Sequence, residues 1–176
     1  MSHRFKILMI ATAAATALIP ATASAGGAKG NLVAAAMKSQ DHQTLVAAVK
    51  AAGLVDTLAG RGPFTVFAPT DAAFAKLPAG TVNTLLKPAN RDQLRSVLTY
   101  HVVPGKVSSA QLVESIRKGG GQAILKTVQG GTLTARLSGG SVAITDAAGG
   151  SARVTKADLV QSNGVIHVTD AVSLPM

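Results

Sequence analysis

The stretch Gly62-Pro63-Phe64-Thr65-Val66-Phe67-Ala68-Pro69-Thr70-Asp71-Ala72-Ala73-Phe74 decides how this chain folds. Phe64 to Phe67 combine aromatic and β-branched residues between two prolines, a pattern typical of a short strand. Pro69 ends that strand. Thr70 or Asp71 can cap the helix that follows, because both side chains accept hydrogen bonds from helical N–H groups. The stretch therefore predicts a strand that passes directly into a helix.

A second informative stretch lies almost at the C-terminus, Ser162-Asn163-Gly164-Val165-Ile166-His167-Val168-Thr169-Asp170-Ala171-Val172. Asn163-Gly164 is a pair that tight hairpin turns favour, because both residues tolerate positive φ. The apolar residues that follow predict a terminal strand. His167 lies within this apolar run, where we expect a structural role.

Helical patterns dominate the N-terminal half of the chain. Asn31 can cap a helix over 32–38, and Asp41 can cap the next helix, which Gly53 ends. Further helices are expected over 54–60, 71–77, 81–86, 89–99 and, after a Ser108 or Ser109 cap, through 116. Tyr100-His101-Val102-Val103 predicts a strand, because it is apolar, partly β-branched and closed by Pro104-Gly105.

Strand patterns dominate from Gly119 onward. Leu133, Ala135 and Leu137 alternate with polar residues, which is the period of a half-buried strand. Glycine pairs at 130–131, 139–140 and 149–150 separate the expected strands and suit tight hairpins. Helices first and strands later favour an α+β fold over alternating β/α units.

The first residues predict a secretory signal peptide. Arg4 and Lys6 form a basic start, an apolar run of 13 residues follows over 7–19, and Ala23-Ser24-Ala25 suits a signal peptidase. The run is shorter than the roughly 20 residues that span a bilayer, so we expect cleavage near Ala25-Gly26 and no span afterwards. The expected organisation is a signal peptide (1–25), a short flexible N-terminus (26–30) and one domain (31–176), in a secreted or periplasmic protein.

The composition bounds the class of partner. The chain has 17 Lys and Arg against 8 Asp and Glu, a formal charge of +9, and no cysteine. A basic surface favours an acidic surface protein or an anionic polysaccharide. The basic residues are scattered and aromatic residues for base stacking are scarce, so we expect no nucleic-acid binding. Without cysteine there is no disulfide framework. We expect a monomer.

The sequence lacks patterns that carry catalysis. Ser108, His101 and Asp71 can be drawn as a triad, but no G-x-S-x-G nucleophile elbow accompanies them. No H-E-x-x-H motif and no phosphate-binding glycine loop occurs. We therefore predict no catalytic residue, no metal site and no cofactor. Two alternatives to a binding module stay open: a carrier of a small apolar or anionic ligand, and a hydrolase.

Together with Leu98-Thr99-Tyr100-His101-Val102-Val103-Pro104-Gly105 between them, the two stretches resemble the boxes of the fasciclin-like domain family, in its secreted single-domain bacterial form. The resemblance extends over about residues 31–175. It implies an α+β wedge, in which a β-sandwich-like strand core is packed by helices concentrated in the N-terminal half. It also implies a non-catalytic module for adhesion or for cell-envelope or matrix binding, through protein or glycan contacts.

The resemblance also implies candidate contact residues. In animal relatives, integrin recognition has been attributed to an Asp-Ile pair before the second box and to the tyrosine–histidine segment. These positions hold Asp158-Leu159 and Tyr100-His101 here, although a lone domain behind a short signal peptide looks bacterial and makes an integrin an unexpected ligand. For Tyr100 and His101 we expect a hydrogen-bonded role in the core, with ligand contact as the alternative. The structural residues of the motifs are Pro69, Thr70, Asp71, Asn163, Gly164 and His167.

Overall fold

The computed structural model describes residues 30–176, so the predicted signal peptide lies outside the described residues. The helices are α1 (Leu32–Lys38), α2 (Gln43–Ala52), α3 (Val55–Ala59), α4 (Asp71–Ala75), α5 (Thr81–Leu85), α6 (Arg91–Tyr100) and α7 (Ser109–Lys118), with 3-10 turns η1 (Gln40–His42) and η2 (Pro88–Asn90). The strands are β1 (Phe64–Pro69), β2 (Val102–Pro104), β3 (Gln122–Lys126), β4 (Thr132–Ser138), β5 (Ser141–Thr145), β6 (Ser151–Gln161) and β7 (Gly164–Thr169).

The two stretches that identify the fold lie side by side in one sheet. β1 pairs in parallel with β7, with Phe64 opposite Gly164 and Pro69 opposite Thr169. The strand order is β2-β1-β7-β6-β5-β4-β3, and the other neighbours are antiparallel. The turn after β3 returns to the far edge, where the Val128 N–H donates to the Val102 carbonyl at 2.8 Å. The seven strands therefore form a single sheet that is nearly closed on itself.

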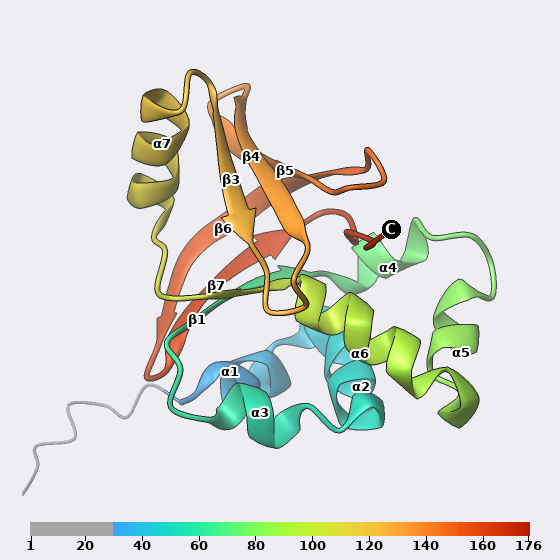
Figure 1. Ribbon diagram of the computed structural model, residues 1–176. Helices are drawn as coiled ribbons and strands as arrows, with labels where there is room; N and C mark the ends of the chain where they lie inside the picture. The colour runs from blue at the N-terminus through green and yellow to red at the C-terminus, as the bar shows by residue number, and fades with distance from the viewer. Residues whose placement is uncertain (1–29) are drawn as a thin grey trace, which may run out of the picture.

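This architecture confirms the predicted α+β class. Figure 1 shows α1, α2, α3 and α6 below β1 and β7, while β3, β4 and β5 rise on the other side with α7 beside them. The strand core is one curled sheet, and its opposite walls take the place of the two layers of a sandwich. Helices precede most of the strands in the chain, as the patterns predict.

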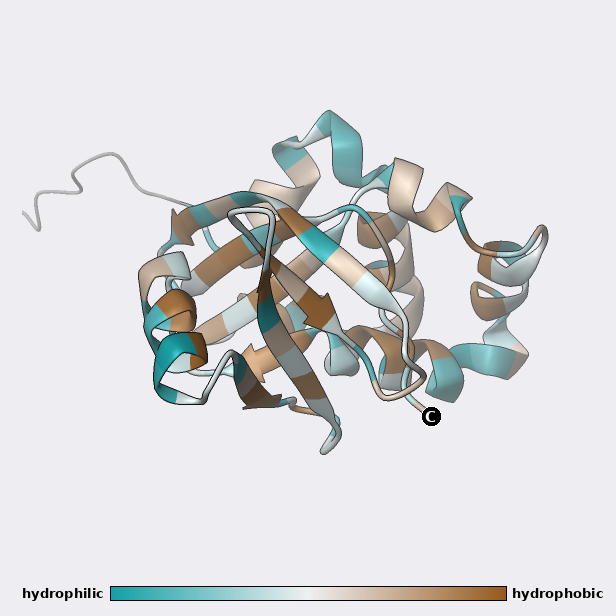
Figure 2. Cartoon of the chain, turned by 90° about the horizontal axis from the view of Figure 1, so that it is seen from above, coloured by the Kyte–Doolittle hydropathy of each residue, from teal (hydrophilic) through white to brown (hydrophobic). Residues whose placement is uncertain are grey.

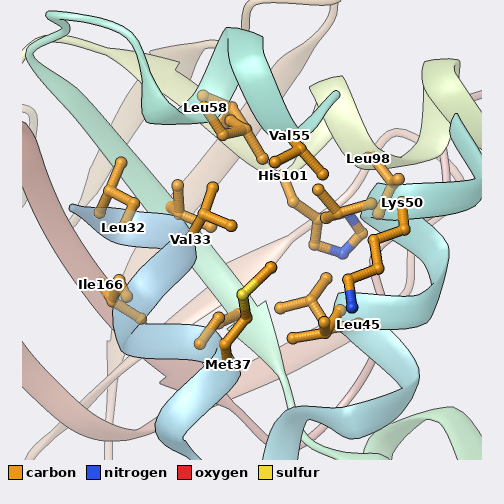
Figure 3. A pocket seen from close by; sticks show the side chains of 16 residues that line it. Leu32, Val33, Met37, Leu45, Lys50, Val55, Leu58, Leu98, His101 and Ile166 are labelled. Carbon is orange, nitrogen blue, oxygen red and sulfur yellow. The ribbon is translucent and has the colours of Figure 1, made fainter. Parts of the chain in front are cut away.

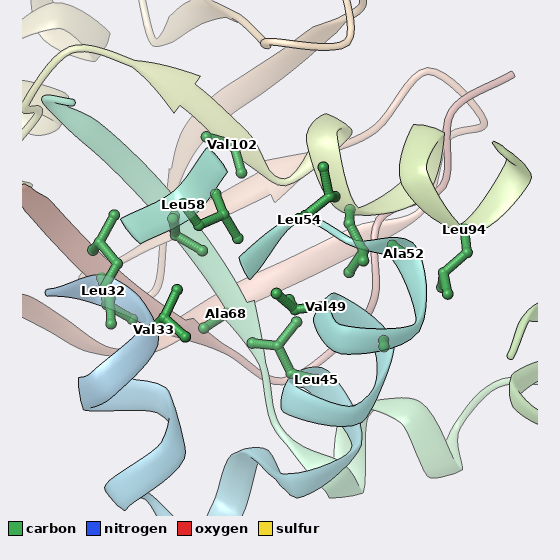
Figure 4. Close-up of a cluster of buried hydrophobic side chains, with 14 of the residues drawn as sticks. Leu32, Val33, Leu45, Val49, Ala52, Leu54, Leu58, Ala68, Leu94 and Val102 are labelled. Atoms are coloured by element: carbon green, nitrogen blue, oxygen red, sulfur yellow. The ribbon is translucent and has the colours of Figure 1, made fainter. Parts of the chain in front are cut away.

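Two apolar cores fill the molecule, one on each side of the central strands. The first lies between α1, α2, α3 and β1, where Leu32, Val49 and Leu58 meet Ala68 (Figure 4). The second lies inside the curled sheet, where α7 contributes Leu112 and Ile116 against Leu133. Figure 2 shows apolar segments on the strands and on the inward faces of helices, with polar segments on outer helical turns. Burial of these aliphatic side chains is the main stabilising term.

Two local predictions about helices are wrong. Tyr100 ends α6 and does not begin a strand, since Leu94, Val97, Leu98 and His101 follow the i, i+3, i+4, i+7 spacing of one helical face. Asp41 does not cap α2. It lies in η1, whose cap is the Ser39 hydroxyl, and α2 begins at Gln43.

The turn between β6 and β7 also differs from the prediction. The two-residue turn is Ser162–Asn163, and neither residue has positive φ, so it is not the primed turn that Asn-Gly suggests. Gly164 is instead the first residue of β7, and a Cβ there would collide with the carbonyl oxygen of Phe64. Glycine at this position allows the close approach of β7 to β1.

Candidate functional site

Asp158 and Leu159 lie on the surface at an irregular point of β6. The register with β7 shifts between Lys156 and Leu159, and Asp158 has a φ of 58°, the one positive value among non-glycine residues of the described range 30–176. The bulge bends β6 and turns both side chains outward. Leu159 is 40% exposed.

The Asp158 carboxylate reaches the first turn of α7. One carboxylate oxygen accepts a hydrogen bond from the Ser109 N–H at 2.7 Å, and the other accepts from the Ser109 hydroxyl. Desolvation acts to raise the pKa of Asp158, but the two hydrogen bonds from Ser109 outweigh it and lower the pKa. The carboxylate is therefore charged at neutral pH and favourably placed at a helix N-terminus.

His167 lies directly beneath this bulge. Its Nδ1 accepts from the Asp158 N–H at 3.3 Å, so the proton resides on Nε2, which donates to the Val107 carbonyl at 2.8 Å. The ring stacks on Phe67 with a centroid separation of 5.6 Å, and the side chain is fully buried. Burial lowers the pKa of His167. The neutral imidazole thus connects β6, β7 and the segment before α7.

Tyr100 and His101 lie in the interior and do not join Asp158 in one surface. The Tyr100 hydroxyl donates to the Thr132 carbonyl at 2.6 Å and accepts from the Ala147 N–H at 3.0 Å. His101 Nδ1 donates to the Val97 carbonyl at 2.8 Å, and Nε2 accepts from the Ser173 N–H at 3.0 Å. Both side chains are at most 3% exposed. Partner contact through them would require the fold to open.

The first box supplies caps for two different helices. The Thr70 hydroxyl accepts from the Ala73 N–H at 3.2 Å, which caps α4. The Asp71 carboxylate instead accepts from the Thr44 N–H at 2.7 Å and the Gln43 N–H at 3.3 Å. It therefore caps α2, which lies nearly thirty positions earlier in the chain. Pro69, the last residue of β1, is fully buried opposite Thr169.

Asn163 joins three segments that are remote in sequence. Its side-chain oxygen accepts from the Leu32 N–H at 2.9 Å, and its amide nitrogen donates to the carbonyls of Leu58 at 2.8 Å and Gly60 at 2.7 Å. The side chain is buried and bonds to the start of α1 and the end of α3. Asn163 therefore holds distant segments together through tertiary hydrogen bonds, a larger role than the local turn that the sequence suggests.

Sequence reasoning missed Thr65. Its buried hydroxyl donates to the Gly105 carbonyl at 2.7 Å and accepts from the Val107 N–H at 2.9 Å. It thereby fixes the segment that leads from β2 into α7, and so the position of Ser109 beside Asp158. A polar residue between the apolar Phe64 and Val66 is the only signal in the sequence, because the hydroxyl's partners lie about forty residues away.

The described residues place no catalytic constellation together. Ser108, His101 and Asp71, which the sequence allows as a triad, are bonded to Gln111, Val97 and Thr44 respectively. Ser109, Asp158 and His167 are neighbours, but the Ser109 hydroxyl bonds to the carboxylate and not to the imidazole. Within residues 30–176 no three acidic, histidine or cysteine side chains are grouped as metal ligands, and no helix has the length and apolar character to cross a membrane.

An apolar pocket lies between α1, α2, α3 and β1. Its walls are aliphatic, with His101 at the back and Lys50 at one side (Figure 3). Met37 and Lys50 are both exposed and so lie at the opening. The cavity holds about 40 Å³, enough for a few atoms of an apolar group.

Comparison with known proteins shows a consistent similarity. A family profile described as Fasciclin domain matches residues 40–175. Protein sll1483 of Synechocystis sp. is 50% identical over 144 residues, which cover 82% of this chain and 73% of that protein. Immunogenic protein MPB70 of Mycobacterium bovis is 35% identical over 155 residues, covering 85% and 72%. Human periostin is 32% identical over 135 residues, covering 77% of this chain and 15% of periostin.

A solved structure agrees with the sequence matches. The FAS1 domain pair from the insect cell adhesion molecule fasciclin I superposes with a TM-score of 0.72 at 21% identity. The superposition covers 82% of this chain and 51% of that one, so this chain spans about half of the solved pair. At this identity the likeness concerns the fold.

Proposed function

Because this chain belongs to the fasciclin domain family, we propose that it is an exported, non-catalytic interaction module for adhesion or for cell-envelope or matrix contacts. The observation that carries the proposal is the position of the motif residues in the structure. Tyr100, His101, Asn163 and His167 all make buried hydrogen bonds within the fold. Asp158 and Leu159 alone among the candidates stay at the surface, as an anionic group beside an exposed apolar one.

The placement of Asp158-Leu159 suits contact with a protein partner. Ser109 and α7 hold the Asp158 carboxylate in one position, so little side-chain entropy is lost when a partner binds. Leu159 adds an apolar surface that is hydrated in the free protein, and its burial in a complex is favourable. A partner with a cation beside an apolar pocket would fit this pair.

The test is retention of the protein on cell envelopes of its source organism. We expect Leu159→Ser to lower retention several-fold, since it removes the apolar contact without disturbing the core. Leu137→Ser is the matched control, because Leu137 is 43% exposed at the tip of another hairpin. Equal retention of wild type and Leu159→Ser, with unchanged thermal midpoints, would remove this pair from the site. Absence of retention of the wild type on any envelope fraction would overturn the adhesion proposal.

A carrier of a small apolar or anionic ligand is the second candidate function. The aliphatic pocket between α1 and α2, with Lys50 at its opening, favours it. A ligand larger than the cavity of about 40 Å³ would require α1, a helix of seven residues with two buried side chains, to move outward. Native mass spectrometry of protein purified from its source tests this candidate. A bound mass supports it, and a clean apo mass contradicts it.

A further inference from the structure

Strands β3 to β6 present one face to the core and the other to solvent. Ala123, Leu133, Ala135 and Ile144 point inward and are buried. The residues of the opposite parity face outward, and we call them the hydroxyl face: Gln122, Ile124, Lys126, Thr132, Thr134, Arg136, Ser138, Ser141, Ala143, Thr145, Ser151 and Arg153. The strands nearest the viewer in Figure 2 alternate between apolar and polar residues accordingly.

The pairing register places two cations of this face, Arg136 and Arg153, in one row across the strands. Arg136 is opposite Ala143, and Ala143 is opposite Arg153, so the two arginines lie two strands apart, about 10 Å between backbones. Ala143, whose small side chain is 9% exposed, is the residue between them. On the other side Arg136 donates to the Gln122 side-chain oxygen at 2.8 Å, which orients its guanidinium along the row. Lys126 lies further along β3.

No carboxylate belongs to the hydroxyl face. Four acids of the described chain are used instead as acceptors for backbone N–H groups: Asp71, Asp146, Asp158 and Asp170. Asp170 accepts from the Arg153 N–H at 2.8 Å, and it also lies 3.8 Å from Lys76. Within residues 30–176 the ion pairs involve Lys76 and Lys118, so Lys126, Arg136 and Arg153 have no anionic partner there.

We propose that the hydroxyl face binds an acidic polysaccharide that carries carboxylate groups along its chain, a proposal that rests on the interaction function above and adds a second contact surface to the Asp158-Leu159 pair. Arginine matches a carboxylate with two parallel hydrogen bonds, and the two arginines of the row, with Lys126 beside them, suit anions that recur along a chain. Threonine and serine hydroxyls between the cations both donate and accept, as sugar hydroxyls require. Ile124, 68% exposed, offers an apolar contact to the C–H face of a sugar ring.

Other polyanions fit this face less well. The face has no aromatic side chain on which a base could stack. Ile124 is its one large apolar residue, so the face has little apolar area that could be buried in a membrane surface. A protein interface is usually centred on aromatic and apolar anchors, and small hydroxyl residues take their place here.

The test measures binding of the protein to polygalacturonate, with neutral dextran as the uncharged comparison. We expect binding to polygalacturonate alone, weakened by added salt because the contacts are exposed. The variant K126Q/R136Q/R153Q should lose about tenfold or more in affinity, since it removes the local field of the face. The matched control K38Q/R61Q/K87Q removes the same charge from exposed positions on the helical side and should stay within about twofold. Circular dichroism verifies that both variants fold.

Several results would overturn the assignment. Equal losses in the two triple variants would mean that net charge, and not this face, attracts the polyanion. Tighter binding to duplex DNA or to phosphatidylglycerol vesicles than to polygalacturonate would assign the face to another partner. If envelope retention persists without polygalacturonate binding, the face assignment fails while the interaction function stands. If polygalacturonate binds but no envelope fraction retains the protein, the adhesion proposal fails alone.

Discussion

The side chain of Asn163 holds several segments of this fold together. Its three hydrogen bonds reach α1, the end of α3 and the residue after it; the first two are buried and the third is partly buried. Removing the amide would leave an N–H and two carbonyl groups without partners where water has little access. Buried polar groups that lose their partners are costly, and the cost rises with their number.

We therefore expect Asn163→Ala to lower the free energy of unfolding by about 3 kcal/mol or more. Asn90→Ala is the matched control, because Asn90 makes a single bond, to the Thr84 carbonyl at 2.7 Å, at an exposed site. Its cost should stay below about 1 kcal/mol. Urea denaturation measures both. Similar losses in the two variants would contradict the fastening role of Asn163.

The buried histidines predict a pH dependence of stability. Burial lowers the pKa of His42, His101 and His167, so the folded state holds them neutral where the unfolded chain, with a histidine pKa of about 6.5, begins to bind protons. Between the folded value and about 6.5 the unfolded state holds more protons, and stability therefore rises with pH in this window and levels off above it. The pKa values of Asp71 and Asp158 are lowered by hydrogen bonds that outweigh desolvation, so these two residues make stability depend on pH only below about pH 4.

Denaturation series from pH 8 to 5 measure the effect. The free energy of unfolding should stay level to about pH 7 and then fall with a slope of up to about 1.4 kcal/mol per pH unit for each histidine held neutral. His101→Gln removes one titrating group and should give a shallower slope, whatever its stability at pH 8. A slope that is unchanged in His101→Gln, or a rise in stability toward pH 5, would contradict the buried neutral state.

At the scale of elements, helix capping is shared between distant parts of the chain. Asp71 caps α2 from the first turn of α4, and Asp158 reaches α7 from a bulge in β6. Each carboxylate therefore fixes one element against another as well as satisfying N–H groups. Thr65 does the same for the segment between β2 and α7 through its hydroxyl.

Asp71→Ala should cost about 1–2 kcal/mol, the usual range for loss of a helix cap. Asp41→Ala is a sharp control, because Asp41 is the cap that the local sequence predicts for the same helix, although its exposed carboxylate lies in η1. That substitution should change stability by less than about 0.5 kcal/mol. Thermal and urea unfolding give both values. A larger effect at Asp41 than at Asp71 would restore the local interpretation.

These elements show what the sequence can and cannot predict. The strand over Phe64–Pro69, the Asn31 cap of α1 and the Ser108 cap of α7 follow from local patterns, because the interacting atoms are neighbours in the chain. The end of α6 could also be predicted from the sequence, because His101 continues the helical spacing of Leu94, Val97 and Leu98. The hydrogen-bond partners of Asp71, Asn163 and Asp158 could not be predicted from the sequence, because each partner lies 27 to 131 positions away in the chain. For the same reason the register that assembles the hydroxyl face appears only in the folded sheet.

At the scale of the whole molecule, the acidic and the basic side chains lie in different surroundings. Four of the eight carboxylates accept hydrogen bonds from backbone N–H groups, whereas most lysines and arginines project into solvent. The formal charge of +9, which is +7 without Arg4 and Lys6 of the predicted signal peptide, therefore acts mainly as repulsion among exposed cations. Salt screens exposed charges strongly and partly buried hydrogen bonds weakly.

Added salt should therefore stabilise this protein while weakening its contacts with polyanions. Raising NaCl from about 10 to 300 mM shortens the Debye length from about 30 Å to under 10 Å, which removes most of the repulsion between separate surface cations. We expect the thermal midpoint at pH 7.5 to rise by a few degrees. The variant K38E/R61E/K87E lowers the charge by six and should respond less. A fall in the wild-type midpoint would mean that surface ion pairs outweigh the repulsion, although the two pairs of the described chain, Lys76–Asp170 and Lys118–Glu114, are both exposed and so contribute little.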